Sequence, residues 1–134
     1  MADRLILTLA ILGGTGKLGR GLAFRWAKAG YHVIIGSRTP EKAGQAAEEL
    51  NQKLERQAIE GMGNEQAAEA CDIAVLSVPY SSQQETLASV KQQLEGKVLI
   101  AVTNPLNRQD IYAVHMPPAG SAAQEAQELL GTGT

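Results

Sequence analysis

The chain has 134 residues, which is enough for one domain with a buried core. Hydrophobic residues make up 44% of it and charged residues 19%, a composition typical of globular proteins. The formal net charge of −2 lacks the basic excess of a nucleic-acid-binding surface, and no apolar run approaches the roughly 20 residues that span a bilayer. We therefore expect a single domain over residues 1–134 that binds neither nucleic acid nor a membrane.

Cys71 is the only cysteine, so an internal disulfide is excluded. The first four residues lead directly into an apolar run and show no signal-peptide pattern. Both observations predict a location in the reducing cytoplasm. Because Cys71 lies between an expected helix and an expected strand, we interpret it as a small buried hydrophobic residue.

A glycine-rich segment at residues 13–19 separates the first expected strand, residues 5–12, from the first expected helix. That helix ends near Ala29, followed by Gly30 as a C-terminal cap. A GxGxxG motif placed between a strand and a helix indicates dinucleotide binding. The alternative, a P-loop, is excluded because Leu18 and Ile11 stand where that motif needs a hydroxyl and its first glycine.

Each glycine of the motif has a distinct expected role. Gly14 permits the tight turn out of the strand, Gly16 lets the backbone approach a pyrophosphate, and Gly19 lets the helix pack closely. Backbone N–H groups at the helix start, together with the positive end of the helix dipole, then hold the anion.

Strands and helices alternate along the rest of the chain. Further strands are expected at residues 32–36, 58–62, 72–78 and 97–102, and further helices at residues 40–54, 64–71, 82–94 and 121–130. The expected helix starts are Thr39 followed by Pro40, Asn64 as a cap, and capping boxes that begin at Ser82 and Ser121. This alternation predicts an α/β Rossmann fold, a doubly wound parallel sheet with strand order 3-2-1-4-5.

In such a sheet, ligands bind at the carboxyl ends of the strands, beside the first strand. The end of the second expected strand decides between NAD and NADP. An NAD site usually has an acidic residue there, but this chain has Ser37 and Arg38, and the first acid, Glu41, already lies in a helix. The guanidinium of Arg38 suits a phosphate, with Thr15 and Lys42 as further donors. The sequence therefore predicts NADP as the cofactor.

The residues expected to bind the cofactor come from the glycine turn and from the ends of the second, fourth and fifth strands. They are Gly14, Thr15, Gly16, Lys17, Leu18, Gly19, Ser37, Arg38, Lys42, Ser77, Val78, Pro79, Tyr80, Asn104 and Pro105. No Cys/His cluster has metal-ligand spacing, and no tyrosine is followed by lysine four residues later, so neither a metal nor a catalytic side chain is assigned.

Residues 10–19 together with residues 36–38 resemble the NADPH-dependent reductases of coenzyme F420, and residues 60–80, 103–106 and 120–123 extend the resemblance. It implies that Thr15, Ser37, Arg38 and Lys42 surround the adenosine 2′-phosphate. It also implies that Leu18, Val78 and Pro79 lie along the nicotinamide half. The implied reaction is hydride transfer between NADPH and a deazaflavin of the F420 type or another redox acceptor, which needs positioning more than acid–base catalysis. The alternative is a non-catalytic NADPH sensor or a subunit that lends its cofactor to a partner.

Proteins of this family continue with a further strand and a smaller helical region, whereas this chain stops after a helix. We expect the fifth strand, and an apolar stripe on the last helix formed by Ala122, Ala126, Leu129 and Leu130, to be covered by a second copy or by a further C-terminal segment. The expected assembly is a homo-oligomer, and the chain alone is expected to reduce F420 poorly.

Overall fold

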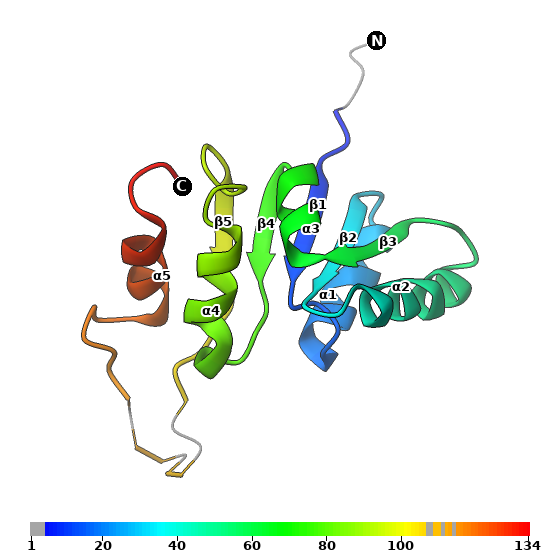
Figure 1. Ribbon diagram of the computed structural model, residues 1–134. Helices are drawn as coiled ribbons and strands as arrows, with labels where there is room; N and C mark the ends of the chain where they lie inside the picture. The colour runs from blue at the N-terminus through cyan, green and yellow to red at the C-terminus, as the bar shows by residue number, and fades with distance from the viewer. Residues whose placement is uncertain (1–4, 107–108, 111, 114) are drawn as a thin grey trace.

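A computed structural model describes residues 5–106, 109–110, 112–113 and 115–134. Its strands are β1 (Thr8–Leu12), β2 (His32–Ser37), β3 (Ile59–Gly63), β4 (Ile73–Leu76) and β5 (Val98–Ala101). Its helices are α1 (Lys17–Lys28), α2 (Pro40–Leu54), α3 (Asn64–Ala70), α4 (Tyr80–Val90) and α5 (Ala122–Leu130). The strands form one parallel sheet in the order β3-β2-β1-β4-β5 (Figure 1), which confirms the predicted fold.

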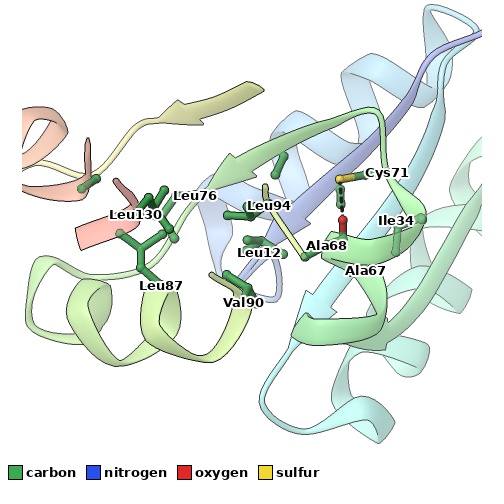
Figure 2. Close-up of a cluster of buried hydrophobic side chains, with 13 residues drawn as sticks. Leu12, Ile34, Ala67, Ala68, Cys71, Leu76, Leu87, Val90, Leu94 and Leu130 are labelled. Atoms are coloured by element: carbon green, nitrogen blue, oxygen red, sulfur yellow. Dashed lines mark hydrogen bonds between the residues drawn. The ribbon is translucent and has the colours of Figure 1, made fainter. Parts of the chain in front are cut away.

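The two faces of the sheet have separate cores, because alternate residues of a strand point to opposite faces. On one face, small residues of α1 and α2, such as Ala27 and Ala46, pack over Ile11 and Ile35. On the other face, α3, α4 and α5 pack over Leu12 and Leu76 (Figure 2). Each helix therefore buries one apolar stripe against the sheet.

The buried thiol of Cys71 belongs to the second core. It is 4% exposed, and its Sγ donates to the carbonyl oxygen of Ala68 at 3.3 Å (Figure 2). Burial raises the pKa of this thiol, because a thiolate loses hydration there. The prediction of a small buried hydrophobic residue is confirmed.

Two elements begin more than one residue away from the start that the sequence suggests. The predicted strand at residues 5–12 starts only at Thr8, because its neighbours β2 and β4 first pair with it at Thr8 and Leu9. The capping box at Ser82 is wrong, since α4 already begins at Tyr80, directly after Pro79. Ser121 does cap α5, and its Oγ accepts a hydrogen bond from the backbone nitrogen of Gln124 at 3.1 Å.

The last helix and the last strand differ in how well they are covered. Ala122, Ala126 and Leu130 of α5 are already buried within the chain, so the expectation that another copy or segment must cover this stripe is wrong. Strand β5, in contrast, is an edge strand, and no helix of the described chain covers the face that carries Val98 and Ile100, which are 60% and 44% exposed.

Candidate dinucleotide site

The glycine turn is fixed by backbone geometry and by close approach. Gly13 has a left-handed backbone with φ of +67°, and a Cβ built on it would lie 2.1 Å from Cγ1 of Val78. The sequence assigned the tight turn to Gly14, whereas the left-handed residue is its neighbour Gly13. Gly14 is instead held by a hydrogen bond from its N–H to the carbonyl oxygen of Gly36 at 2.9 Å. A Cβ on Gly19 would lie 2.6 Å from the Cα of Gly14, so the helix packs onto the turn as predicted.

Gly16 is the N-cap of α1, and it faces open space. It is exposed, and a Cβ built on it would meet no atom within 4 Å. The first turn of the 12-residue helix contains no acidic residue, so nothing there opposes an anion. Unpaired backbone N–H groups and the helix dipole therefore leave the start of α1 suited to a phosphate.

The end of β2 carries the cationic side chains predicted for the cofactor's phosphate. Arg38 and Lys42 are exposed, and neither side chain has a hydrogen bond or ion pair with any described residue. Arg20 behaves differently, because its Nη1 pairs with Oε2 of Glu49 at 2.7 Å and its Nε donates to the carbonyl oxygen of Thr15 at 2.9 Å. Arg20 thus supports the turn, while Arg38 and Lys42 remain available to a ligand.

Three adjoining cavities connect these features along the carboxyl ends of the strands. The turn cavity, of about 270 Å³, is lined by Gly13, Thr15, Gly16, Ser37, Arg38, Thr39, Lys42, Asn64, Ser77, Val78, Pro79, Ser82 and Thr86. The β2-end cavity, of about 420 Å³, shares Ser37, Arg38 and Asn64 with it and adds Pro40, Gly63, Glu65, Gln66 and Ser89. The strand-end cavity, of about 260 Å³, is lined by Gly16, Lys17, Leu18, Gly19, Ser77, Val78, Pro79, Tyr80, Val102, Thr103 and Asn104. The turn cavity shares lining residues with each of the other two, and the three cavities together are called the cleft below.

The cleft brings together 13 of the 15 residues that the sequence assigned to it. Of the other two, Gly14 is buried beneath the turn, and Pro105 lines a neighbouring cavity of about 450 Å³ with Asn104 and His115. Sequence reasoning missed Asn64 as a lining residue. It treated Asn64 as a helix cap, but the cap of α3 is Gly63, and the Asn64 side chain reaches the glycine turn instead.

Tyr80 stands where the strand-end cavity meets α5. Its hydroxyl donates to Oε2 of Glu125 at 2.8 Å, and its ring meets the ring of His115 edge-on at a centroid distance of 5.9 Å. The hydrogen bond to the Glu125 carboxylate raises the pKa of Tyr80, since ionisation would forfeit that bond. The phenol is therefore a neutral wall of the cleft at neutral pH.

Within the described ranges, no group of three or more His, Cys, Asp or Glu side chains comes together as metal ligands would. None of the helices placed by the structure combines the length and apolar character that crossing a membrane requires. What the cleft offers is cationic side chains, a helix start and apolar walls, and this set suits an elongated anionic ligand with aromatic rings.

Residues 8–105 match the model of a protein family described as NADP oxidoreductase, coenzyme F420-dependent. An F420-dependent NADP reductase of Methanothermobacter marburgensis is 48% identical over 103 residues, which cover 75% of this chain and 46% of that protein. A reductase of the same name from Methanocaldococcus jannaschii is 38% identical over 131 residues, covering 92% of this chain and 58% of that protein. The chain thus spans about half the length of the curated relatives it matches.

A similar fold occurs in a crystal structure described as an F420-dependent NADP reductase of Arthrobacter sp. FB24. The TM-score is 0.75 at 26% sequence identity, and the match covers 92% of this chain and 58% of the other. The match leaves about two fifths of the Arthrobacter protein without a counterpart here.

Proposed function

Because the chain belongs to the coenzyme F420-dependent NADP oxidoreductase family, we propose that it binds NADP(H) in this cleft and transfers hydride between NADPH and a deazaflavin of the F420 type. One observation carries the cofactor assignment. The end of β2 presents two cationic side chains, Arg38 and Lys42, without partners among the described residues. An acidic residue that would accept hydrogen bonds from an unphosphorylated ribose is missing there.

The residues of the cleft fit the parts of NADP in order. Thr15, Gly16 and the following backbone N–H groups at the start of α1 would hold the pyrophosphate. Ser37, Arg38 and Lys42 would hold the 2′-phosphate, because a guanidinium can make paired hydrogen bonds to phosphate oxygens. Leu18, Val78, Pro79 and Tyr80 of the strand-end cavity would hold the nicotinamide half, with Asn104 and Pro105 beyond them.

The chain's own residues position and shield the reacting groups. The bound nicotinamide supplies or receives the hydride, so no acid or base is needed from the protein. Leu18, Val78 and Pro79 would form the apolar walls beside the nicotinamide ring. The glycine turn would hold the cofactor in place, and hydride transfer requires reacting atoms about 3–3.5 Å apart.

Titration calorimetry of the unmodified protein with NADPH and with NADH tests the cofactor assignment. We expect NADPH to bind at least about tenfold more tightly, which corresponds to about 1.4 kcal/mol. Equal affinities would overturn the assignment. Mixing the NADPH-bound protein with F420 and following the absorbance of F420 then tests hydride transfer.

A second candidate function is that of a non-catalytic NADPH sensor or a cofactor-binding subunit. The open face of β5, which carries the exposed side chains Val98 and Ile100, favours it, because no described helix covers this end of the sheet. We expect little or no F420 reduction by this chain alone. Selective NADPH binding combined with no reduction of F420, even with an added partner domain, would favour the sensor.

We also propose that the protein is cytoplasmic and homo-oligomeric, with a second copy covering the open face of β5. An edge strand with exposed valine and isoleucine side chains invites pairing. Light scattering tests this assembly, and a monomer at micromolar concentration would contradict it.

A further inference from the structure

Asn64 is the first residue of α3, and its side chain lies between the ends of β1, β2 and β3. Asn64 follows β3 directly, is 7% exposed, and its Oδ1 accepts a hydrogen bond from the backbone nitrogen of Gly13 at 3.1 Å. A backbone N–H can only donate, so the atom that faces the glycine turn is the amide oxygen. The amide nitrogen Nδ2 must then point away from the turn.

The amide nitrogen of Asn64 is free and accessible. It has no hydrogen bond with any described residue. It is not enclosed either, because the only enclosed, unpaired side-chain atom in the described part of the chain is Oε1 of Gln83. Asn64 lines both the turn cavity and the β2-end cavity, and Ser37 and Arg38 are the two residues that line both with it. Asn64 therefore lies where these two cavities meet, and its Nδ2 has no partner among the described residues.

The end of β2 is shaped around this amide. A Cβ built on Gly36 would lie 2.7 Å from Oδ1 of Asn64 and 3.2 Å from Cβ of Ala67. The carbonyl oxygen of Gly36 meanwhile accepts the hydrogen bond from Gly14. Gly36 thus leaves the room that Asn64 occupies and holds the turn at the same time, so the amide is fixed in one orientation.

We propose that Asn64 helps to select NADP(H) over NAD(H) by donating from Nδ2 to the 2′-phosphate side of the adenosine ribose; this inference rests on the proposed cofactor. An NAD site presents an acceptor to the ribose hydroxyls. Here the amide nitrogen presents only donors, and a phosphate oxygen only accepts. Asn64 is thus a positioning residue through Oδ1 and a specificity-determining residue through Nδ2.

The substitution Asn64→Asp separates the two roles. The aspartate keeps an oxygen that can accept from Gly13, so the turn and the thermal unfolding midpoint should be preserved, but it has no donor for a phosphate. We expect the affinity for NADPH to fall by about tenfold or more, the range for a hydrogen bond to a charged group, while the affinity for NADH changes by less than about threefold. The measured quantity is the ratio of the two affinities.

Two further variants make the test specific. Gln45→Glu adds the same charge at an exposed position of α2 that lines none of the three cavities, while Asn64 stays intact, and we expect it to leave most of the NADPH preference. Asn64→Ala removes the donor without adding a charge, and we expect it to weaken both cofactors but NADPH more. Equal losses for NADPH and NADH in both Asn64 variants, or a fall of the NADPH-to-NADH affinity ratio in Gln45→Glu as large as that in Asn64→Asp, would overturn the proposal.

Nuclear magnetic resonance of the unmodified protein tests the same contact without a substitution. Adenosine 2′,5′-bisphosphate should shift the side-chain amide protons of Asn64, whereas adenosine 5′-monophosphate at equal saturation should not. Equal shifts would overturn the role of Asn64. If the unmodified protein shows no preference for NADPH at all, the proposed cofactor fails instead, so the two failures are distinguishable.

Discussion

One row of side chains crosses the sheet from edge to edge, and its two ends are very different. The register places Gly61, Ile35, Ile11, Val75 and Ile100 in this row, on the face covered by α1 and α2. At the β3 end, α2 packs so closely that a Cβ on Gly61 would lie 2.2 Å from the carbonyl of Ala43. At the β5 end, Ile100 is 44% exposed.

This contrast separates the part of the sheet that the described helices cover from the part whose face is open. The turn, the end of β2 and the start of α3 lie in the covered part, where β1 and β2 have α1 and α2 on one face and α3 on the other (Figure 1). The strand-end cavity borders the open face of β5, since Val102 and Leu18 line it and are themselves exposed. We expect cofactor binding to depend on the first part and acceptor binding on whatever covers the second.

The largest expected effect compares two isoleucines of this row. Ile35→Ala should lower the free energy of unfolding by about 2–5 kcal/mol, because it leaves a cavity beneath α1 and α2. Ile100→Ala should cost the monomer less than about 1 kcal/mol, because Ile100 is already partly in water. Urea unfolding measures both. Similar losses would mean that β5 is covered in solution, and the loss at Ile100 should then depend on protein concentration.

The next effect concerns the turn in the covered part. Gly16→Val should reduce NADPH affinity by more than about a hundredfold, or about 2.7 kcal/mol, because the side chain would occupy the pyrophosphate position. Stability should be unchanged, since a Cβ there meets no atom within 4 Å. Gly21→Val is the matched control, because Gly21 is equally free of neighbours within 4 Å but lies outside the cleft. Normal NADPH binding by Gly16→Val in calorimetry would show that the cofactor does not use this turn.

A smaller effect tests the end of β2. Arg38→Ala should remove most of the preference for NADPH over NADH, about 1.4 kcal/mol, because it deletes a charge-assisted contact to the 2′-phosphate. Arg25→Ala removes the same charge from an exposed position of α1 and should leave the preference intact. If the Arg38→Ala variant still prefers NADPH over NADH, the main contact to the 2′-phosphate would come from Lys42 or Asn64 instead.

The smallest expected effect concerns the reactivity of the Cys71 thiol. It tests whether the part of the sheet that contains β4 and β5 is open on one face only. Burial raises the pKa of the Cys71 thiol, so the folded protein holds this proton more tightly than the unfolded chain. The resulting stabilisation is present below the unfolded pKa and is lost as the pH rises through the folded pKa. We expect iodoacetamide at pH 8 to modify folded Cys71 far more slowly than the urea-unfolded protein. Equal rates would show that the α3–α4–α5 side is open as well.

Local patterns in the sequence predicted most of the fold. The alternation of strands and helices predicted the strand order, because parallel strands need crossover helices and these have a fixed hand. The glycine motif, Arg38 and the missing acid predicted the cleft and its charge. Each of these signals is short-range, so a single sequence contains it.

The remaining features depend on contacts between distant segments. Asn64 meets Gly13 across 51 positions of the chain, and nothing near Asn64 in the sequence distinguishes that contact from a helix cap. The first strand starts at Thr8 because its partners start there, and α4 starts at Tyr80 because Pro79 precedes it. The α5 stripe looks unpartnered in sequence, yet α4 supplies its partner. Burial and side-chain hydrogen bonds depend on which distant segments come into contact, and only the tertiary structure determines those contacts.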